Sequence, residues 1–269
     1  MSNTQVGRTI GDYRLEAVIG AGNLGTVYQA TALRDNTPAA VKIVHDTLTG
    51  DPGFPDRFKG VGGAAAALQH PNVVRVLACG NAGEDYYLAM ELLARGSLRS
   101  MLERRDDRPS LGRTVDLIRQ AAEALGYAHS QRVIHRDIKP ENIMLARADA
   151  SAGGGAVRVV DFGMMQLIDT GVTMVGRNAP GSPRYMSPEQ CAGKPPEARS
   201  DIYSLGVVLY EAATGYPPFQ VNTMAEAIDK HLSAMPASPR SVNNAIPAEL
   251  ERVILRCLAK KADDRYASA

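Results

Sequence analysis

Cysteine is scarce in this sequence of 269 residues, and the three present, Cys79, Cys191 and Cys257, form no CxxC pair. Such a scattered, odd count argues against a disulfide framework or a zinc site, and it favours reduced thiols in a cytosolic compartment. An excess of one charge is also missing, since 30 Lys and Arg residues balance 29 Asp and Glu residues at a net charge of +1. We therefore expect no nucleic-acid partner and no binding to a membrane surface.

Long apolar runs are missing as well. The longest one, around Leu205 and Leu209, is interrupted by Gly206 and is far too short to span a bilayer. The N-terminus lacks the charged and then apolar segments of a secretion signal. The chain is nevertheless 45% hydrophobic, enough to fill a core, and its length suits either one large core or two lobes that share a cleft.

The residue pattern changes along the chain. Short runs rich in Val, Ile, Leu and Tyr predict strands over residues 13–19, 26–31, 39–44, 73–78 and 86–92. One helix is predicted among them, over residues 55–69. After Gly96, helical spacing dominates and includes a predicted helix over 246–260, with Pro247 in its first turn. The pattern predicts a small strand-rich lobe, a hinge near residues 91–96 and a larger helical lobe, with a flexible surface loop over 148–156.

A glycine-rich run, Gly20-Ala21-Gly22-Asn23-Leu24-Gly25, lies between two predicted strands. A dinucleotide-binding fingerprint needs a helix after its third glycine, and here a strand follows. The run is therefore a hairpin whose glycines let backbone N–H groups approach phosphates closely. Taken alone, an ordinary glycine hairpin explains it equally well.

Lys42 follows in an otherwise apolar strand, Ala39-Ala40-Val41-Lys42-Ile43-Val44. An edge-strand lysine that reaches water is one interpretation. Because a lysine buried in a strand is costly without an anionic partner, its place after the glycine run favours a phosphate-binding lysine.

Two further segments contain the groups that phosphoryl transfer needs. The first reads His135-Arg136-Asp137-Ile138-Lys139-Pro140-Glu141-Asn142, and the second reads Asp161-Phe162-Gly163. Phosphoryl transfer requires metal ligands, a group that orients and deprotonates the attacking hydroxyl, and cations for the transferring oxygens. Either segment alone could be turn chemistry, but both in this order after the glycine run and Lys42 indicate a catalytic site.

With these motifs the chain resembles the protein kinase family, and specifically the eukaryotic-like serine/threonine kinases of bacteria. The match covers about residues 10–267, and the residues at 185–190 and 201–206 are similar to those of the bacterial members. The resemblance implies an α+β, bilobal kinase fold: a small lobe with a five-stranded antiparallel sheet and helix C, and a larger, mainly helical lobe. It divides the chain into an N-terminal extension (1–11), an N-lobe (12–93) and a C-lobe (94–269) that is truncated near its last helix.

The resemblance also implies residue roles. Asp137 is the expected base, Lys139 steadies the γ-phosphate and favours Ser/Thr substrates, and Asn142 and Asp161 are the expected ligands of Mg²⁺. ATP is the expected second cofactor. The positions implied for ATP binding are Ile19, Gly20, Ala21, Gly22, Asn23, Leu24, Gly25, Val27, Ala40, Lys42, Met90, Glu91, Leu93 and Met144.

Residues 161–189 resemble an activation segment. The resemblance implies that Arg136 pairs with a phosphate there, for which Thr170 and Thr173 are the available hydroxyls and Thr173 is favoured. Ser182 stands where a threonine usually contacts the base and Lys139. Three structural positions follow from the same resemblance, namely a buried ion pair and an aspartate that supports the catalytic loop: Glu189, Arg265 and Asp201.

One departure from the family pattern lies in the predicted helix C. The position of the glutamate that normally pairs with the strand lysine is occupied by Val61, and Asp56 is too early in the helix to replace it. Gly60, Gly62 and Gly63 each weaken a helix by roughly 1 kcal/mol relative to alanine. We therefore expect the first half of the helix to be loose, with Lys42 either poorly placed or held by Asp161 or ATP.

The sequence therefore predicts a protein kinase that phosphorylates serine or threonine. The alternatives are an ATP-binding pseudokinase that acts as a scaffold, because of Val61, and a small-molecule kinase of similar fold. Domains of this kind can pair through their small lobes, so a homodimer through the N-lobe is a further expectation. The expected location is the cytoplasm, either alone or as the cytoplasmic part of a larger, membrane-anchored chain.

Overall fold

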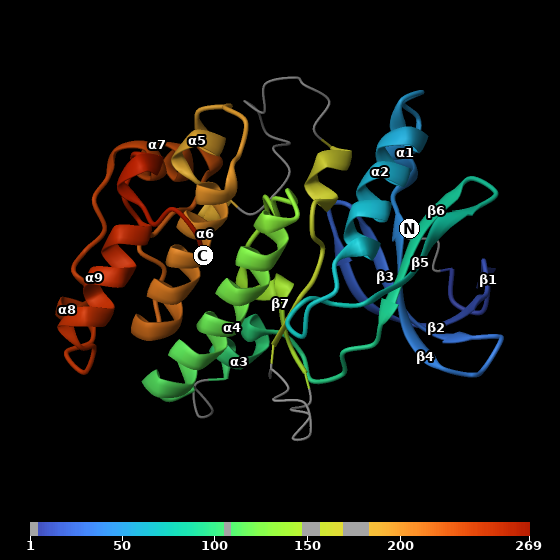
Figure 1. The fold of residues 1–269 in the computed structure, drawn as a ribbon, viewed down its shortest axis with the longest axis horizontal. Helices are drawn as coiled ribbons and strands as arrows, with labels where there is room; N and C mark the ends of the chain where they lie inside the picture. Colours follow the sequence, from blue (N-terminus) through green and yellow to red (C-terminus); the bar gives the residue numbers. More distant parts are fainter. Residues whose placement is uncertain (1–4, 105–108, 147–156, 169–182) are drawn as a thin grey trace.

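The computed structural model describes residues 5–104, 109–146, 157–168 and 183–269. Two lobes lie on either side of a cleft, one built around a sheet and the other around helices (Figure 1). The α+β, two-lobed architecture expected from the sequence is therefore confirmed. No helix in the described part of the chain is both long enough and apolar enough to span a bilayer.

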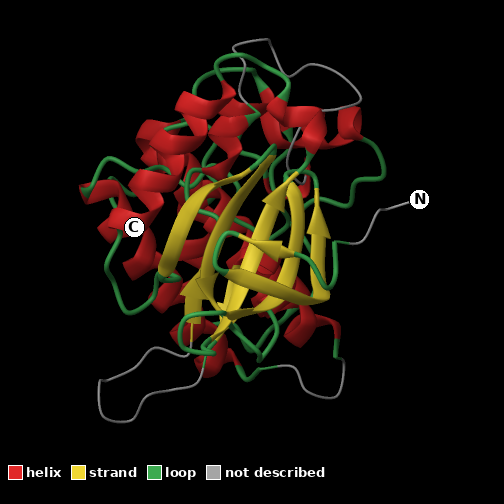
Figure 2. Cartoon of the chain, turned by 90° about the vertical axis from the view of Figure 1, so that its right-hand side faces the viewer, coloured by secondary structure: helices red, strands yellow, loops and turns green. Residues whose placement is uncertain are grey.

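The small lobe is an antiparallel sheet with the strand order β1-β2-β3-β4-β6-β5 (Figure 2). Its six strands are β1 (Thr9–Ile10), β2 (Tyr13–Gly22), β3 (Gly25–Ala32), β4 (Pro38–Val44), β5 (Val76–Ala82) and β6 (Asp85–Glu91). The expected number of five was wrong by one, because residues 9 and 10 turn back and pair with the start of β2. Ile10 is buried there, so these two residues of the expected N-terminal extension contribute to the sheet.

Strand β5 begins later than the pattern predicted. Val73 and Val74 precede this strand and contact the large lobe instead. Val73 forms an isolated bridge with Val159, and the Val74 N–H donates to the Val159 carbonyl at 3.0 Å. Val159 ends a short strand of the large lobe, and the Asp-Phe-Gly segment begins two residues later. The N-lobe therefore fixes the point from which Asp161 enters the cleft.

Two helices belong to the small lobe, α1 (Asp46–Thr49) and α2 (Phe54–Ala67), and α2 packs against β5. The helix α2 corresponds to the predicted helix C. Phe54 and Phe58 anchor its first half through edge-on contacts with Tyr86, at centroid distances of 5.0 and 5.2 Å. The helix runs unbroken through all three of its glycines, and the looseness of its first half stays a prediction.

The large lobe packs around α4 and α6, whose apolar faces form its core. Its helices are α3 (Leu98–Glu103), α4 (Leu111–Ser130), α5 (Pro188–Cys191), α6 (Ala198–Thr214), α7 (Met224–Ser233), α8 (Pro239–Val242) and α9 (Ala248–Cys257). Short 3₁₀ helices and two strands complete it: η2 (Pro140–Asn142), η3 (Met164–Leu167), η4 (Pro183–Tyr185), η5 (Ala262–Asp264), β7 (Ile143–Leu145) and β8 (Val157–Val159). The last helix is shorter than predicted, and Pro247 precedes it as the N-cap.

Candidate active site

The cleft between the lobes has a volume of about 640 Å³. Every residue that the sequence implied for ATP binding lines it, together with Asp137, Lys139, Asn142 and Asp161. The motifs are far apart in the chain, and the fold brings them to one cavity. Residues that sequence reasoning missed also line the cavity: Gly96, Ser97, Ser100, Glu141, Val160 and Met165.

The glycine run forms the turn between β2 and β3, with Gly22 opposite Gly25. A β-carbon on Gly25 would lie 2.1 Å from the carbonyl oxygen of Ile43, so only glycine permits this approach to β4. His45, just after β4, contacts this turn through both its side chain and its backbone. Its Nε2 lies 2.8 Å from the Gly22 carbonyl oxygen, and its backbone N–H donates to the Leu24 carbonyl at 3.1 Å. His45 therefore restrains the turn that faces the cleft.

Lys42 lies on β4 with its side chain buried, and its Nζ is 2.7 Å from Oδ2 of Asp161. Burial alone would raise the pKa of the Asp161 carboxyl, but the neighbouring Lys42 ammonium outweighs it and lowers that pKa. Asp161 is therefore an anion at neutral pH. Of the expected alternatives for Lys42, the structure has the one in which Asp161 holds it.

Asp137 lies in the loop before η2, and two side chains converge on its carboxylate. Lys139 Nζ and Asn142 Nδ2 lie 2.5 and 3.2 Å from Asp137 Oδ2. Asn142 Nδ2 also donates to the Asp137 carbonyl at 2.8 Å. Because η2 begins at a proline, whose fixed φ suits a first helical turn, the loop has few alternative conformations.

Asp201, at the start of α6, holds this loop through its backbone. Its carboxylate accepts the N–H groups of His135 and Arg136, both at 2.8 Å, and His129 Nε2 at 2.8 Å. Arg136 has a φ of 72°, a conformation that non-glycine residues rarely adopt. The buried carboxylate stabilises that conformation and so fixes the residue that precedes Asp137.

The donor atoms suit a hard divalent cation. Asp161 and Asn142 both line the cleft, and carboxylate and amide oxygens are ligands that Mg²⁺ prefers. Asn142 uses its amide nitrogen toward Asp137, which leaves its amide oxygen for a cation. The described residues contain no group of three or more His, Cys, Asp and Glu side chains that could hold a metal ion. The site therefore fits a cation that completes its ligand shell with phosphate oxygens and water.

Comparison with known proteins agrees with this geometry. The model of the protein kinase domain family matches residues 13–269. The chain belongs to the protein kinase domain family. Among solved structures, a variant of the PknI kinase domain of Mycobacterium tuberculosis is similar, with a TM-score of 0.75 and 25% identity over 100% of this chain and 95% of that one.

Curated relatives of this kinase domain are 35–39% identical to it. They include a probable serine/threonine-protein kinase of Clostridium acetobutylicum, PknB of Mycolicibacterium smegmatis and pkn3 of Myxococcus xanthus. These are matched at 35%, 37% and 39% identity over 96%, 96% and 98% of this chain. The chain spans 38%, 41% and 49% of their lengths, respectively.

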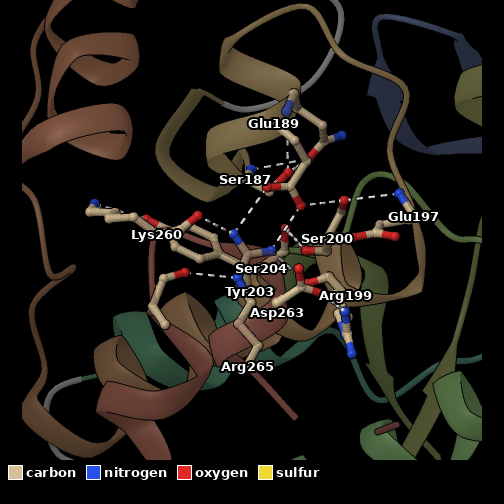
Figure 3. Close-up of polar contacts among 12 residues, drawn as sticks. Ser187, Glu189, Glu197, Arg199, Ser200, Tyr203, Ser204, Lys260, Asp263 and Arg265 are labelled. Carbon is tan, nitrogen blue, oxygen red and sulfur yellow. Dashed lines mark hydrogen bonds and ion pairs between the residues drawn. The ribbon is translucent and has the colours of Figure 1, made fainter. Parts of the chain in front are cut away.

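A buried ion pair in the large lobe joins Glu189 of α5 to Arg265 near the end of the chain (Figure 3). Arg265 donates to both carboxylate oxygens of Glu189, at 2.8 and 3.0 Å. The other three N–H groups of its guanidinium donate to the carbonyls of Arg199, Ala259 and Lys260, so all five donors are used. Burial would raise the pKa of Glu189, but Arg265 and Ser200 lower it on balance.

Sequence reasoning missed a second polar network, which is centred on Arg99 of α3. Its guanidinium lies 2.8 Å from Glu141 in η2 and 2.9 Å from Glu211 in α6. Tyr185 of η4 donates to Glu211 at 2.6 Å and also contacts Arg99. Burial and the Glu211 carboxylate raise the pKa of Tyr185, which keeps it a neutral donor. The network therefore joins η2, which follows Asp137, to η4 and to α6.

The remaining predicted positions fall into two groups. Val61 is buried on α2 and belongs to the apolar cluster of the N-lobe, whereas Asp56 is exposed. Thr170, Thr173 and Ser182 lie outside the described residues.

Proposed function

We propose that this chain transfers the γ-phosphate of ATP to serine and threonine hydroxyls of proteins, with Mg²⁺ as the metal. The observation that carries the proposal is the arrangement at Asp137. Its carboxylate binds Lys139 and Asn142 within 3.2 Å, in a cleft that the Lys42–Asp161 ion pair also lines.

In the proposed reaction Asp137 accepts the proton of the substrate hydroxyl as its oxygen bonds to the γ-phosphorus of ATP, and the bond from that phosphorus to the bridging oxygen breaks and releases ADP. Asn142 orients the carboxylate, and the nearby ammonium of Lys139 is available to the transferring phosphoryl oxygens. Asp201 keeps the loop in place through the backbone, so that little reorganisation accompanies the transfer.

Nucleotide binding follows from the lining of the cleft. Ile19, Val27, Ala40 and Met144 supply apolar surface for the adenine, and the backbone of Glu91 and Leu93 can hydrogen-bond its edge. The glycine turn lets backbone N–H groups approach the phosphates, and Lys42 contacts the α- and β-phosphates. Mg²⁺ supplies charge neutralisation on the phosphates when it is bound by Asp161 and Asn142.

The proposal includes regulation by autophosphorylation on Thr173 or Thr170, with Arg136 as the phosphate partner. It also includes pairing of two domains through their N-lobes. The cytoplasm is the proposed location, supported by the three free cysteines.

The scaffold alternative is less favoured. The curated relatives are named serine/threonine-protein kinases, and the proposed base, lysine and metal ligands are all in the cleft. Val61 was the reason for that alternative, but Asp161 provides Lys42 with the anionic partner that Val61 cannot.

The test is Mg-ATP-dependent phosphate incorporation into the chain itself and into a generic Ser/Thr substrate. Asp137→Asn should abolish incorporation and retain ATP binding, whereas Asp56→Asn, which changes an exposed acid, should alter neither. Mass spectrometry of the incubated protein would locate the modified hydroxyl. ATP binding without incorporation in the unmodified protein would refute the proposal in favour of the scaffold.

A further inference from the structure

One face of α2 packs on the segment that follows Asp161. Val61 is only 8% exposed, and a β-carbon built on Gly163 would lie 3.9 Å from Cγ1 of Val61. Val61 shares the N-lobe apolar cluster with three buried side chains of η3, namely Met164, Met165 and Leu167. An apolar contact therefore lies where the family pattern has a charged one.

A tight backbone turn joins Asp161 to the start of η3. Asp161 and Gly163 have φ values of 66° and 69°, and Met164 N–H lies 3.3 Å from the Asp161 carbonyl oxygen. Between them, Phe162 packs into the core of the large lobe, with its ring centroid 4.8 Å from that of His135. Only Phe162 and Gly163 separate Asp161 from η3, so a shift of η3 would also move the backbone of Asp161.

A different face of α2 approaches β5. A β-carbon on Gly62 would lie 2.0 Å from Sγ and 3.1 Å from Cβ of Cys79, so a larger residue here would force Cys79 or the helix to shift. Gly60 and Gly63, in contrast, have no heavy atom within 4 Å of a built β-carbon. Of the three glycines, only Gly62 is required by packing, and it places α2 close to the sheet.

A carboxylate at position 61 would enter an apolar cluster. Burying a charge there is unfavourable unless a cation meets it, and Lys42 is already paired with Asp161 at 2.7 Å. Taking Lys42 from Asp161 would leave a second buried carboxylate without its partner. The surroundings of Val61 therefore suit an apolar side chain.

We propose that Val61 is a positioning residue: its packing on Gly163 and η3, together with the Gly62–Cys79 contact, places α2 and Asp161 for phosphoryl transfer without a carboxylate on α2. This inference rests on the proposed function. In this chain apolar packing, and not an ion pair, then determines the position of α2.

The test is a series of substitutions at Val61, with kcat and KM for ATP measured beside the thermal melting temperature. Val61→Ile keeps the apolar contact and should keep kcat within about twofold. Val61→Thr keeps the shape but introduces a hydroxyl, and it should lower kcat by about tenfold with a smaller change in KM, since displacement of a catalytic group reduces the rate of the chemical step. Val61→Glu should lower kcat further.

A kcat for Val61→Glu equal to or above that of the unmodified chain would overturn the inference. So would a loss of melting temperature in Val61→Thr and Val61→Glu without any change in kcat, since Val61 would then have only a structural role.

Hydrogen exchange separates this inference from the proposed function. Val61→Thr should speed exchange of the amides of α2 and η3, whereas Val115→Thr, at an exposed valine of α4, should leave them unchanged. Absence of activity in the unmodified chain would refute the proposed function alone. Unchanged exchange in Val61→Thr would refute the positioning role alone.

Discussion

The ammonium group of Lys42 lies 2.7 Å from a carboxylate oxygen of Asp161, and the two residues come from different lobes. Removing Lys42 leaves the Asp161 carboxylate without its cation. We expect Lys42→Met, without nucleotide, to lower the free energy of unfolding by about 3–5 kcal/mol, as for other buried pairs that lose one partner. Denaturant unfolding measures this change.

The matched control for that prediction is Lys194→Met, at an exposed lysine of the large lobe, which should change stability by less than about 0.5 kcal/mol. Adding Asp161→Asn to Lys42→Met should recover part of the loss, with a coupling of about 0.5–3 kcal/mol. Equal effects of the two lysine substitutions would show that the contact does not stabilise the fold.

The glycines of α2 should respond differently to alanine. Gly60→Ala and Gly63→Ala place a methyl group in open space and should each stabilise the chain by about 0.5–1 kcal/mol. Gly62→Ala should destabilise it, since its β-carbon would overlap Cys79 Sγ. Thermal melting of the three variants tests the order.

A second substitution that removes the Cys79 side chain provides the control. In Gly62→Ala/Cys79→Gly the overlap is gone, so alanine at position 62 should cost less than it does beside Cys79. If Gly62→Ala melts like Gly60→Ala, α2 does not approach β5 as closely as the structure has it.

His45 should affect nucleotide binding. The contact between its Nε2 and the Gly22 carbonyl restrains the glycine turn, and a hydrogen bond of this kind contributes about 1 kcal/mol, or roughly fivefold in an equilibrium constant. We expect His45→Ala to raise the Kd and the KM for ATP by about this factor, with kcat nearly unchanged.

Glutamine can place an amide N–H near the position of Nε2, so His45→Gln should restore most of the affinity. Isothermal titration with ATP and steady-state kinetics check both variants. An affinity of His45→Ala equal to that of the unmodified chain would exclude this restraint.

His231 should make stability depend on pH. It is buried on α7, where its Nδ1 accepts from the Tyr203 hydroxyl at 2.9 Å and its Nε2 donates to the Arg184 carbonyl at 3.1 Å. Burial first, and then the Lys260 ammonium, lower its pKa from 6.5 to about 4. The unfolded chain therefore binds a proton in this window that the folded chain does not, and stability falls as the pH falls from 6.5 toward 4.

The contribution lost over this window is about 3 kcal/mol, at 1.36 kcal/mol for each pKa unit. His231→Gln keeps a donor and an acceptor but cannot titrate, so its unfolding free energy should vary less between these pH values. Denaturant unfolding at several pH values measures the slope, and an unaltered slope in the variant would show that other groups cause it.

The sequence predicted the lining of the cleft far better than the elements around it. Asp137, Asn142 and Asp161 belong to local motifs whose chemistry is visible in a few residues. Strand β1 was missed because two residues, Thr9 and Ile10, are too few to show alternation.

Long-range polar partners could not be predicted either. Arg99 contacts Glu211, which is 112 residues away. His45 contacts the backbone carbonyl of Gly22, and because every residue has a carbonyl, the sequence does not indicate which one is the partner. The three glycines of α2 are alike in sequence, and only the position of Cys79 distinguishes Gly62 from the other two.

The bidentate pair between Glu189 and Arg265 has a consequence for biosynthesis, because 76 positions separate the two residues. At about 5–20 residues per second, a ribosome needs roughly 4–15 s to synthesise that stretch. Throughout this interval the Glu189 carboxylate lacks Arg265 as its partner. The part of the large lobe around Glu189 can therefore form this contact only after Arg265 has been added, late in the translation of this domain.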